Sequence, residues 1–271
     1  MTGTAQPAWA AAVPVPAYAV QGSGQATVVF LHGVGGDRQS WAPQLAAFAR
    51  RFRAVAWDAP GYGASAPLQP MTFPGLAASL ALLLDDLGVD AAHLVGQSFG
   101  GMIAQEFAAT YPARVKSLVL TATSPAFGRS DGDFQKRFIA DRLAPLEAGR
   151  TMAELAEGIV GGLFGDKPDP AGVKAAVGSM SRVSPDTYRA SMLCIVGFDR
   201  REALGRIAVP TLVLAGARDT NAPAPMMEKM ASKIPGARYV CLAGAGHLAN
   251  LEQPAAFNEI VMKFLTEVEG G

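Results

Sequence analysis

The chain has 271 residues, of which 23 are basic and 23 acidic, and half are apolar. A chain of this length can bury one large apolar core, and its balanced charge excludes a strong attraction to nucleic acid or to an anionic membrane surface. We therefore expect one domain whose partner is a small molecule, in a monomer or a homodimer.

Short β-branched segments alternate along the chain with longer segments rich in alanine and leucine. This alternation predicts an α/β fold in which crossover helices cover both faces of a mostly parallel sheet. In chain order, strands are expected at 28–31, 54–57, 92–95, 115–121, 209–215 and 238–242. Helices are expected between and after them, at 41–50, 76–87, 100–111, 224–233 and 254–268.

The pattern changes between residues 124 and 206. This stretch contains amphipathic segments and glycine and proline pairs, but no clear buried strand. Because the core pattern resumes at residue 209, we predict a helical cap (lid) inserted at 124–206 into a core domain that comprises 1–123 and 207–271.

Three features of the sequence indicate the compartment in which the protein works. The first twenty residues have no basic segment ahead of an apolar run and do not resemble a secretory signal. The longest strongly apolar run in the middle of the chain, 76–84, has about half the length that a membrane-spanning helix needs. Cys194 and Cys241 are the only cysteines, and two thiols so far apart are typical of a reduced protein. We expect a cytoplasmic protein without a membrane partner.

The segment Gly96-Gln97-Ser98-Phe99-Gly100 matches the G-x-S-x-G pattern of a nucleophilic serine. It stands directly after an expected strand and directly before an expected helix, which is the context that the pattern requires. At such a sharp turn the serine takes a strained backbone conformation, and the glycines avoid collisions with neighbouring chain. We predict that Ser98 is the catalytic nucleophile, against the alternative of an incidental serine in a glycine-rich turn.

A serine hydroxyl needs a base within hydrogen-bond distance, and the chain has three histidines. His32 lies at the end of an expected strand and His93 at the start of the strand that leads to Ser98, so neither position suits the base. His247 lies in a loop between the last strand and the last helix, which is the third place in the order serine, acid, histidine. We predict that His247 is the general base.

The same order requires an acid between Ser98 and His247. Asp219 follows the strand expected at 209–215 and precedes a helix whose start is marked by prolines. A solvated carboxylate beside Arg218 and an N-cap for that helix are other common uses of an aspartate at such a position. We predict that Asp219 orients His247 and stabilises its charged form.

Acyl transfer passes through an anionic intermediate whose oxygen needs two donors that are aimed at it in advance. At a strand–serine–helix turn one donor is the N–H of the residue after the nucleophile, which here is Phe99. The glycine-rich segment 32–36 follows an expected strand, and its glycines let backbone amides face inward. We assign the second donor of this oxyanion hole to the Val34 N–H, with a plain flexible turn as the alternative.

Five segments carry a resemblance to a known family: FLHGVGG, DAPGYGAS, GQSFGG, GARDTNAP and GAGHLANLEQP. Through them the chain resembles the α/β-hydrolase superfamily over nearly its full length, and within it the 3-oxoadipate enol-lactonases and related small carboxylesterases. The resemblance implies a mostly parallel eight-stranded sheet, a cap inserted after the sixth strand, and neither cofactor nor metal. Only 17–21 looks like one of the two antiparallel strands that open this fold.

These residues predict a serine hydrolase that cleaves a carboxylic ester or a lactone through an acyl-enzyme, similar to 3-oxoadipate enol-lactonase. Ser98 in place of an aspartate argues against haloalkane dehalogenase and epoxide hydrolase chemistry. Leu248 and Leu251 follow His247, where carbon–carbon hydrolases of ring-cleavage products usually carry tryptophan, so we rank that activity second. The same residues would also suit a cofactor-free perhydrolase or haloperoxidase, a lyase, or a ligand-binding receptor without turnover.

Two sets of side chains in the expected cap are candidates for contact with substrate. Six basic side chains could include one that binds a substrate carboxylate: Arg129, Lys136, Arg137, Arg142, Arg182 and Arg189. Seven apolar side chains could line an acyl pocket: Phe127, Phe134, Phe138, Leu143, Leu163, Phe164 and Met192. The alternatives are that the basic side chains lie on solvated helix faces and that the apolar side chains pack the cap onto the core.

Overall fold

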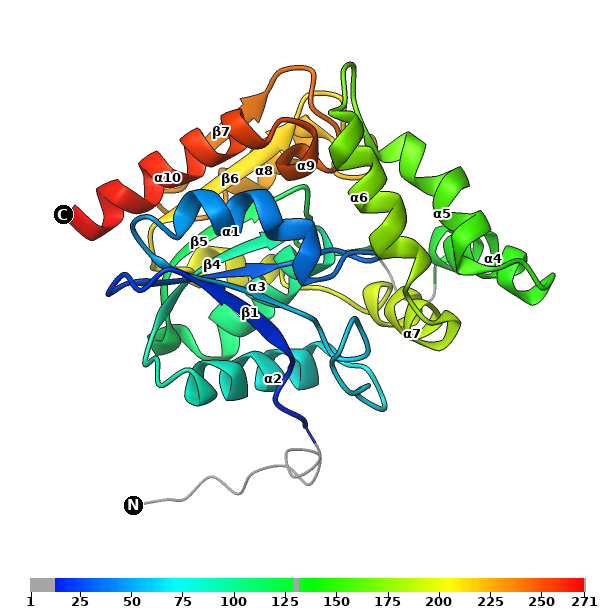
Figure 1. Cartoon of the computed structure of the whole chain (residues 1–271), viewed down its shortest axis with the longest axis horizontal. Coiled ribbons are helices and arrows are strands. Elements are labelled where there is room, and N and C mark those ends of the chain that lie inside the picture. The colour runs from blue at the N-terminus through cyan, green and yellow to red at the C-terminus, as the bar shows by residue number, and fades with distance from the viewer. Residues whose placement is uncertain (1–12, 129–131, 271) are drawn as a thin grey trace.

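The computed structural model describes residues 13–128 and 132–270, and within them the chain has an α/β fold built on one sheet (Figure 1). The strands are β1 (Tyr18–Gln21), β2 (Thr27–Leu31), β3 (Arg53–Trp57), β4 (Ala92–Gln97), β5 (Val115–Thr121), β6 (Thr211–Gly216) and β7 (Arg238–Leu242). Their order in the sheet is β1-β3-β2-β4-β5-β6-β7. Strand β1 is antiparallel to β3, and every other neighbouring pair is parallel.

The expectation of eight strands is wrong for the described residues, which contain seven. The chain between residue 13 and β2 forms one antiparallel strand, β1, and then turns at Gly22, whose φ is +78°. The described residues that precede β1, 13–17, form no strand. As a consequence the helical insertion follows the fifth strand, β5, where the resemblance implied the sixth.

Helices cover both faces of the sheet. Helices α1 (Ala42–Phe48) and α10 (Pro254–Gly270) pack on one face, and α2 (Phe73–Asp86), α3 (Phe99–Thr110) and α8 (Ala224–Ala231) pack on the other. Two core layers result, and the side chains of each strand alternate between them because successive residues of a strand point to opposite faces. The continuous apolar runs of the strands follow from this double cover.

The first predicted helix, 41–50, is present as α1, which ends two residues earlier than expected. A 3-10 helix, η2 (Arg38–Trp41), runs directly into α1. Asp37 caps it, because its carboxylate accepts from the N–H groups of Gln39 at 2.9 Å and of Ser40 at 3.3 Å. The other expected elements are present with small shifts of their ends, of which the largest is the start of α2 at Phe73 instead of 76.

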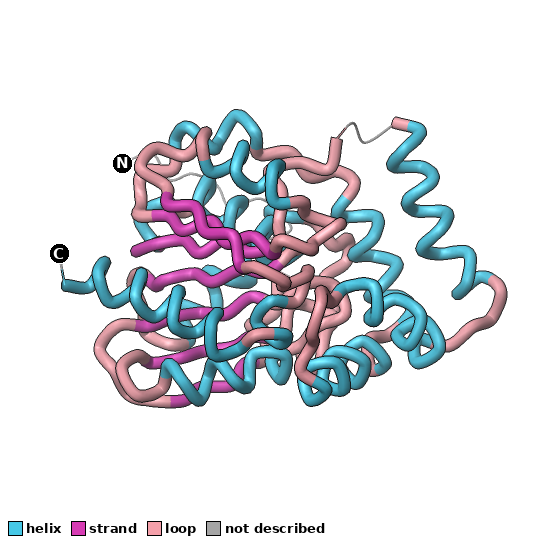
Figure 2. Tube along the Cα trace, turned by 90° about the horizontal axis from the view of Figure 1, so that it is seen from above, coloured by secondary structure: helices cyan, strands magenta, loops and turns pink. Residues whose placement is uncertain are grey.

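Residues 124–206, here called the insertion, form helices in their described part, apart from one isolated bridge. These elements are α4 (Asp133–Glu147), α5 (Met152–Val160), η4 (Gly161–Leu163), α6 (Pro170–Ser181), α7 (Pro185–Ile195) and η5 (Arg201–Arg206). Figure 2 shows helices gathered beyond one end of the strands, and in Figure 1 these are α4 to α7. That the insertion is a cap domain with these boundaries stays a prediction.

Polar contacts fasten the insertion to two loops of the core. The carboxylate of Asp37 accepts from Ser179 Oγ at 3.0 Å and from the Arg182 guanidinium at 2.6 Å. Thr187 Oγ1 donates to the Gly61 carbonyl at 2.9 Å. Helices α6 and α7 are therefore each bonded to a different core loop.

Two further expectations concern the surroundings of the protein. None of the helices in the described ranges is both long and apolar enough to cross a membrane. Cys194 lies on α7 and Cys241 on β7, and both are free thiols. That the protein works in a reducing compartment stays a prediction.

Gly100 lies where α3 passes the end of β2, and a side chain has no room there. A Cβ atom on this residue would collide with the carbonyl oxygen of Leu31. We expect Gly100→Ala to lower the free energy of unfolding by about 1–3 kcal/mol, because backbone rather than a flexible side chain would have to move. Urea denaturation followed by circular dichroism measures the change.

Gly158→Ala is the matched control. Gly158 is exposed on α5, and nothing lies within 4 Å of a Cβ atom added there. This substitution should leave the stability unchanged or raise it by up to about 1 kcal/mol, since alanine favours the helix. An equal loss in both variants would contradict a steric origin of the effect.

Candidate active site

Ser98 lies at the turn between β4 and α3, with a φ of +52° that is rare for a residue with a side chain. Its N–H donates to the Thr121 carbonyl at 3.0 Å, and its own carbonyl accepts from Thr123 Oγ1 at 2.8 Å. A Cβ atom on Gly96 would lie 2.5 Å from the Gly100 oxygen. The strained backbone and the tight glycine contacts are those expected of a nucleophile turn.

His247 and Asp219 come from the loops after β7 and β6 and are joined by a hydrogen bond. His247 Nδ1 lies 2.8 Å from Asp219 Oδ2. The other carboxylate oxygen, Oδ1, accepts from the N–H groups of Asn221 at 2.8 Å and Ala222 at 3.0 Å. An ionised carboxylate only accepts, so this bond assigns the ring proton to Nδ1 and leaves Nε2 as the accepting nitrogen of the neutral ring.

Asp219 is 5% exposed, which excludes a solvated surface carboxylate. Burial alone would raise the pKa of Asp219, but the hydrogen bond and charge of His247 and the two backbone amides hold this pKa below its ordinary value. Arg218, the alternative partner, pairs with Asp166 instead, with 3.0 Å between Nε and Oδ1. Asp219 is therefore ionised at neutral pH and directed at His247.

Ser98, His247 and Val34 line one cavity of about 440 Å³ between the core and the insertion. Five of the seven apolar side chains that we expected to line a pocket do so: Phe127, Phe134, Phe138, Leu163 and Met192. Leu143 and Phe164 instead pack in the core. Among the described residues, no three His, Cys, Asp or Glu side chains are grouped so that they could hold a metal ion.

Arg142 is the one member of the expected basic set among the described residues that line this cavity. Its guanidinium lies over the ring of Phe138, 5.3 Å from the centroid. Lys136 and Arg137 are exposed on α4. Arg182 and Arg189 form ion pairs elsewhere. Arg129 lies outside the described residues. Arg142 thus supplies the permanent charge in a mostly apolar cavity.

The two predicted oxyanion donors lie on separate turns. The Gly36 N–H donates to the Gly33 carbonyl at 3.1 Å and closes a four-residue turn with Val34 and Gly35 at its centre. Gly35 has a φ of +81°, which is typical of the third position of a type II turn. Phe99 is the first residue of α3, so its N–H has no partner within the helix. The role of these two amides stays a prediction.

The other two histidines do not line the cavity that Ser98 lines. His32 is buried, with Nδ1 2.8 Å from the Gly33 carbonyl and Nε2 accepting from the Ala59 N–H at 3.0 Å. These two bonds assign a neutral ring with its proton on Nδ1. His93 is buried and bonded to side chains of β5 and α10. Both histidines therefore have structural partners.

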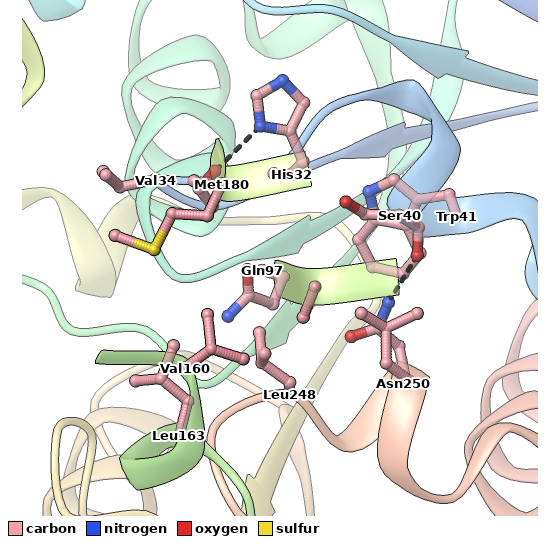
Figure 3. A pocket seen from close by; sticks show the side chains of 15 residues that line it. His32, Val34, Ser40, Trp41, Gln97, Val160, Leu163, Met180, Leu248 and Asn250 are labelled. Carbon is pink, nitrogen blue, oxygen red and sulfur yellow. Dashed lines mark hydrogen bonds between the residues drawn. The ribbon is translucent and has the colours of Figure 1, made fainter. Parts of the chain in front are cut away.

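A second, smaller cavity of about 30 Å³ is lined by the 33–36 turn (Figure 3). In the upper part of Figure 3 Met180 of α6 lies beside Val34, and Leu163 and Leu248 both lie in the lower part. A space of this size holds about one water molecule and no substrate. The larger cavity beside Ser98 is therefore the candidate substrate site, and the insertion packs directly on the loops that form it.

Some residues that shape the site were not singled out from the sequence. Gln97 Nε2 donates to the His247 carbonyl at 3.1 Å, and Thr123 holds the carbonyl of Ser98. Gln97 occupies a variable position of the serine motif, and Thr123 follows β5 outside any motif. Nothing in the sequence marked either residue, because both act on chain segments that only folding brings near.

Known proteins of similar sequence and fold cover nearly the whole chain. The family described as alpha/beta hydrolase fold matches residues 26–254. A Mycobacterium tuberculosis protein, provisionally named non-heme bromoperoxidase BpoC, is 32% identical over 261 residues, which are 93% of this chain and 98% of that protein. The enol-lactonase from Burkholderia xenovorans LB400 has a TM-score of 0.83 at 28% identity, over 92% of this chain and 96% of its own. A thermophilic esterase from Thermogutta terrifontis has a TM-score of 0.83 at 29% identity, over 93% of each chain.

The buried His32 makes the stability depend on pH. Burial lowers the pKa of His32, and the Gly33 carbonyl and nearby acids offset only part of this effect. In the unfolded chain this pKa is ordinary, about 6.5, so the unfolded state takes up a proton first as the pH falls. We expect the free energy of unfolding to fall from about pH 7 to about pH 5, by at most about 1.4 kcal/mol per pH unit for this residue.

Urea denaturation at a series of pH values measures this slope. Burial also lowers the pKa of His93, so that residue adds to the slope in the same direction. His32→Gln should therefore reduce the slope, and the double variant with His93→Gln should nearly remove it. A wild-type slope in His32→Gln would contradict the neutral ring.

Proposed function

We propose, because the chain belongs to the α/β-hydrolase fold family, that it is a serine hydrolase which cleaves a carboxylic ester or a lactone through an acyl-enzyme. One observation carries the proposal: Ser98 lines the same cavity as His247, whose ring is bonded to the buried carboxylate of Asp219. A hydroxyl, an imidazole and a carboxylate in this relation are what acyl transfer to serine requires. Similarity to an enol-lactonase and an esterase adds support.

In the proposed reaction Ser98 Oγ bonds to the substrate carbonyl carbon while its proton moves to His247 Nε2. The N–H groups of Phe99 and Val34 donate to the oxygen that becomes negative, and Asp219 stabilises the imidazolium. Collapse of this intermediate breaks the bond to the leaving oxygen, which takes the proton from Nε2. Water then attacks the acyl-enzyme with the same base, and the carboxylic acid leaves as Ser98 regains its proton.

A perhydrolase now takes second place ahead of the carbon–carbon hydrolase, because one relative is provisionally named a bromoperoxidase. It would use the same acyl-enzyme, with hydrogen peroxide in place of water as the second nucleophile and a peracid as the product. A carbon–carbon hydrolase would use the same three residues on a vinylogous diketone. Side-by-side assays of an ester, a lactone, a vinylogous diketone and peracid formation rank these activities.

Ser98 should be the residue that an active-site probe labels. A fluorophosphonate probe should label the wild-type protein, and Ser98→Ala should abolish the label because this variant lacks the hydroxyl that His247 is proposed to activate. Hydrolysis of short p-nitrophenyl esters should fall by at least about a thousandfold in Ser98→Ala and in His247→Ala, since such residues act as a unit. A Ser98→Ala variant that keeps most of its esterase activity would refute the assignment, and an unlabelled wild-type protein would favour a binding function.

The cavity also supports a class of substrate. Its walls are mostly apolar, and the described lining residues include no carboxylate to balance the guanidinium of Arg142. An arginine forms strong charge-assisted hydrogen bonds with a carboxylate. We therefore propose that the preferred substrates are acids whose ester or lactone group is joined by a mostly apolar chain to a free carboxylate.

Arg142→Gln tests this preference. We expect kcat/KM for a p-nitrophenyl half-ester of a dicarboxylic acid to fall by about tenfold to a hundredfold, since a hydrogen bond to a charged group contributes about 1.5–3 kcal/mol. The neutral ester of equal chain length should be hydrolysed as before. Arg189→Gln is the control, because Arg189 pairs with Glu147 away from the cavity. Equal losses for both esters would contradict a carboxylate site at Arg142.

A further inference from the structure

Glu252 is a buried carboxylate that the proposed reaction does not use. It ends the short helix α9 (Ala249–Glu252), five positions after His247, and is 3% exposed. Its Oε2 accepts from the Gly246 N–H at 2.7 Å, and its Oε1 accepts from the Gly165 N–H at 2.9 Å. One carboxylate thus joins the loop that carries His247 to a segment of the insertion.

Backbone bonds continue along the same contact, here called the seam, between residues 163–166 and 244–247. The His247 N–H donates to the Leu163 carbonyl at 2.7 Å, and the Asp166 N–H donates to the Gly244 carbonyl at 2.9 Å. The two backbones are so close that a Cβ atom on Gly246 would lie 2.6 Å from the Leu163 oxygen. The seam therefore ends at the amide of His247 itself.

The energetics of the seam depend on Glu252. A buried carboxylate is costly unless hydrogen bonds compensate it, and a buried amide without an acceptor is costly too. Glu252 removes both costs at once, because its two oxygens accept from the amides of Gly165 and Gly246. If the insertion moved off the core at this point, the carboxylate would lose one of its two partners in a buried place.

We infer that Glu252 is a positioning residue for His247, which holds the imidazole in its working orientation by binding the insertion to the loop that carries it. The inference rests on the proposed function, since it assumes that His247 is the base. The carboxylate touches no substrate, because Glu252 is not among the residues that line the cavity beside Ser98. The insertion and the imidazole of His247 then reach their working positions together. Loss of Glu252 therefore lowers kcat more than it raises KM.

Glu252→Gln is the test variant. A glutamine offers one accepting oxygen and one NH₂ group, so only one of the Gly165 and Gly246 amides keeps an acceptor and the other faces a donor. We expect kcat to fall by about tenfold to a hundredfold, because small errors in the placement of a catalytic group cost this much. KM should change little, and the low-field proton resonance of His247 Nδ1 should shift or broaden.

Thr187→Val is the matched control. It removes the 2.9 Å bond from Thr187 Oγ1 to the Gly61 carbonyl, which also fastens the insertion to the core but does not touch the seam. The control should lower the melting temperature and leave kcat and the His247 resonance as in the wild type. An equal loss of kcat in Thr187→Val and Glu252→Gln would overturn the inference, because general loosening of the insertion would then explain both.

Glu252→Asp keeps the charge and is the second variant, in case Glu252→Gln does not fold. Its side chain is one methylene shorter and cannot reach both amides, so kcat should fall in this variant as well. A wild-type kcat and an unchanged His247 resonance in the folded variants would overturn the inference while fluorophosphonate labelling of the wild type still supported the hydrolase. Failure of the wild type to label would instead count against the proposed function.

Discussion

The backbone of Ser98 has a φ of +52°, and the sharp turn from β4 into α3 depends on that conformation. Such a conformation costs about 1–3 kcal/mol and persists only where the surroundings determine it. Here the last residue of β5, Thr121, accepts from the Ser98 N–H, and Thr123, just after β5, donates to the Ser98 carbonyl. Gly96 and Gly100 leave the space that the sharp turn needs. This conformation places Ser98 on the wall of the cavity, and the next residue, Phe99, begins α3.

The parallel sheet brings the remaining groups to the same edge. Strands β6 and β7 are paired, with Gly216 opposite Leu242, so the loops that follow them carry Asp219 and His247 to within a hydrogen bond of each other. Strand β4, which leads to Ser98, lies two positions away from β6 in the same sheet. Parallel strands end at one edge, and this edge is where ligands bind in open α/β sheets.

The insertion completes the site from the other side. Its phenylalanines and Arg142 line the cavity. Its anchors lie on different core loops: α6 on Asp37 beside the 33–36 turn, and the 163–166 segment on the loop of His247. The same polypeptide that lines the cavity is therefore bonded to both loops that flank the nucleophile. A change in the seating of the insertion would therefore also reach the 33–36 turn and the loop of His247.

The sequence alone was enough to predict the α/β class and the positions of most strands and helices to within a few residues. It also gave Ser98, His247 and Asp219 as candidate site residues. These predictions rest on strand periodicity, a glycine-flanked turn and the order of residues along the chain, all of which can be read from the sequence. Only the tertiary structure decided that the described residues form seven strands, that Arg142 is the basic side chain at the cavity, and that Gly165 bonds to Glu252 across 87 positions of the chain. These features depend on which distant segments come within hydrogen-bond distance, and no pattern along the chain encodes that distance.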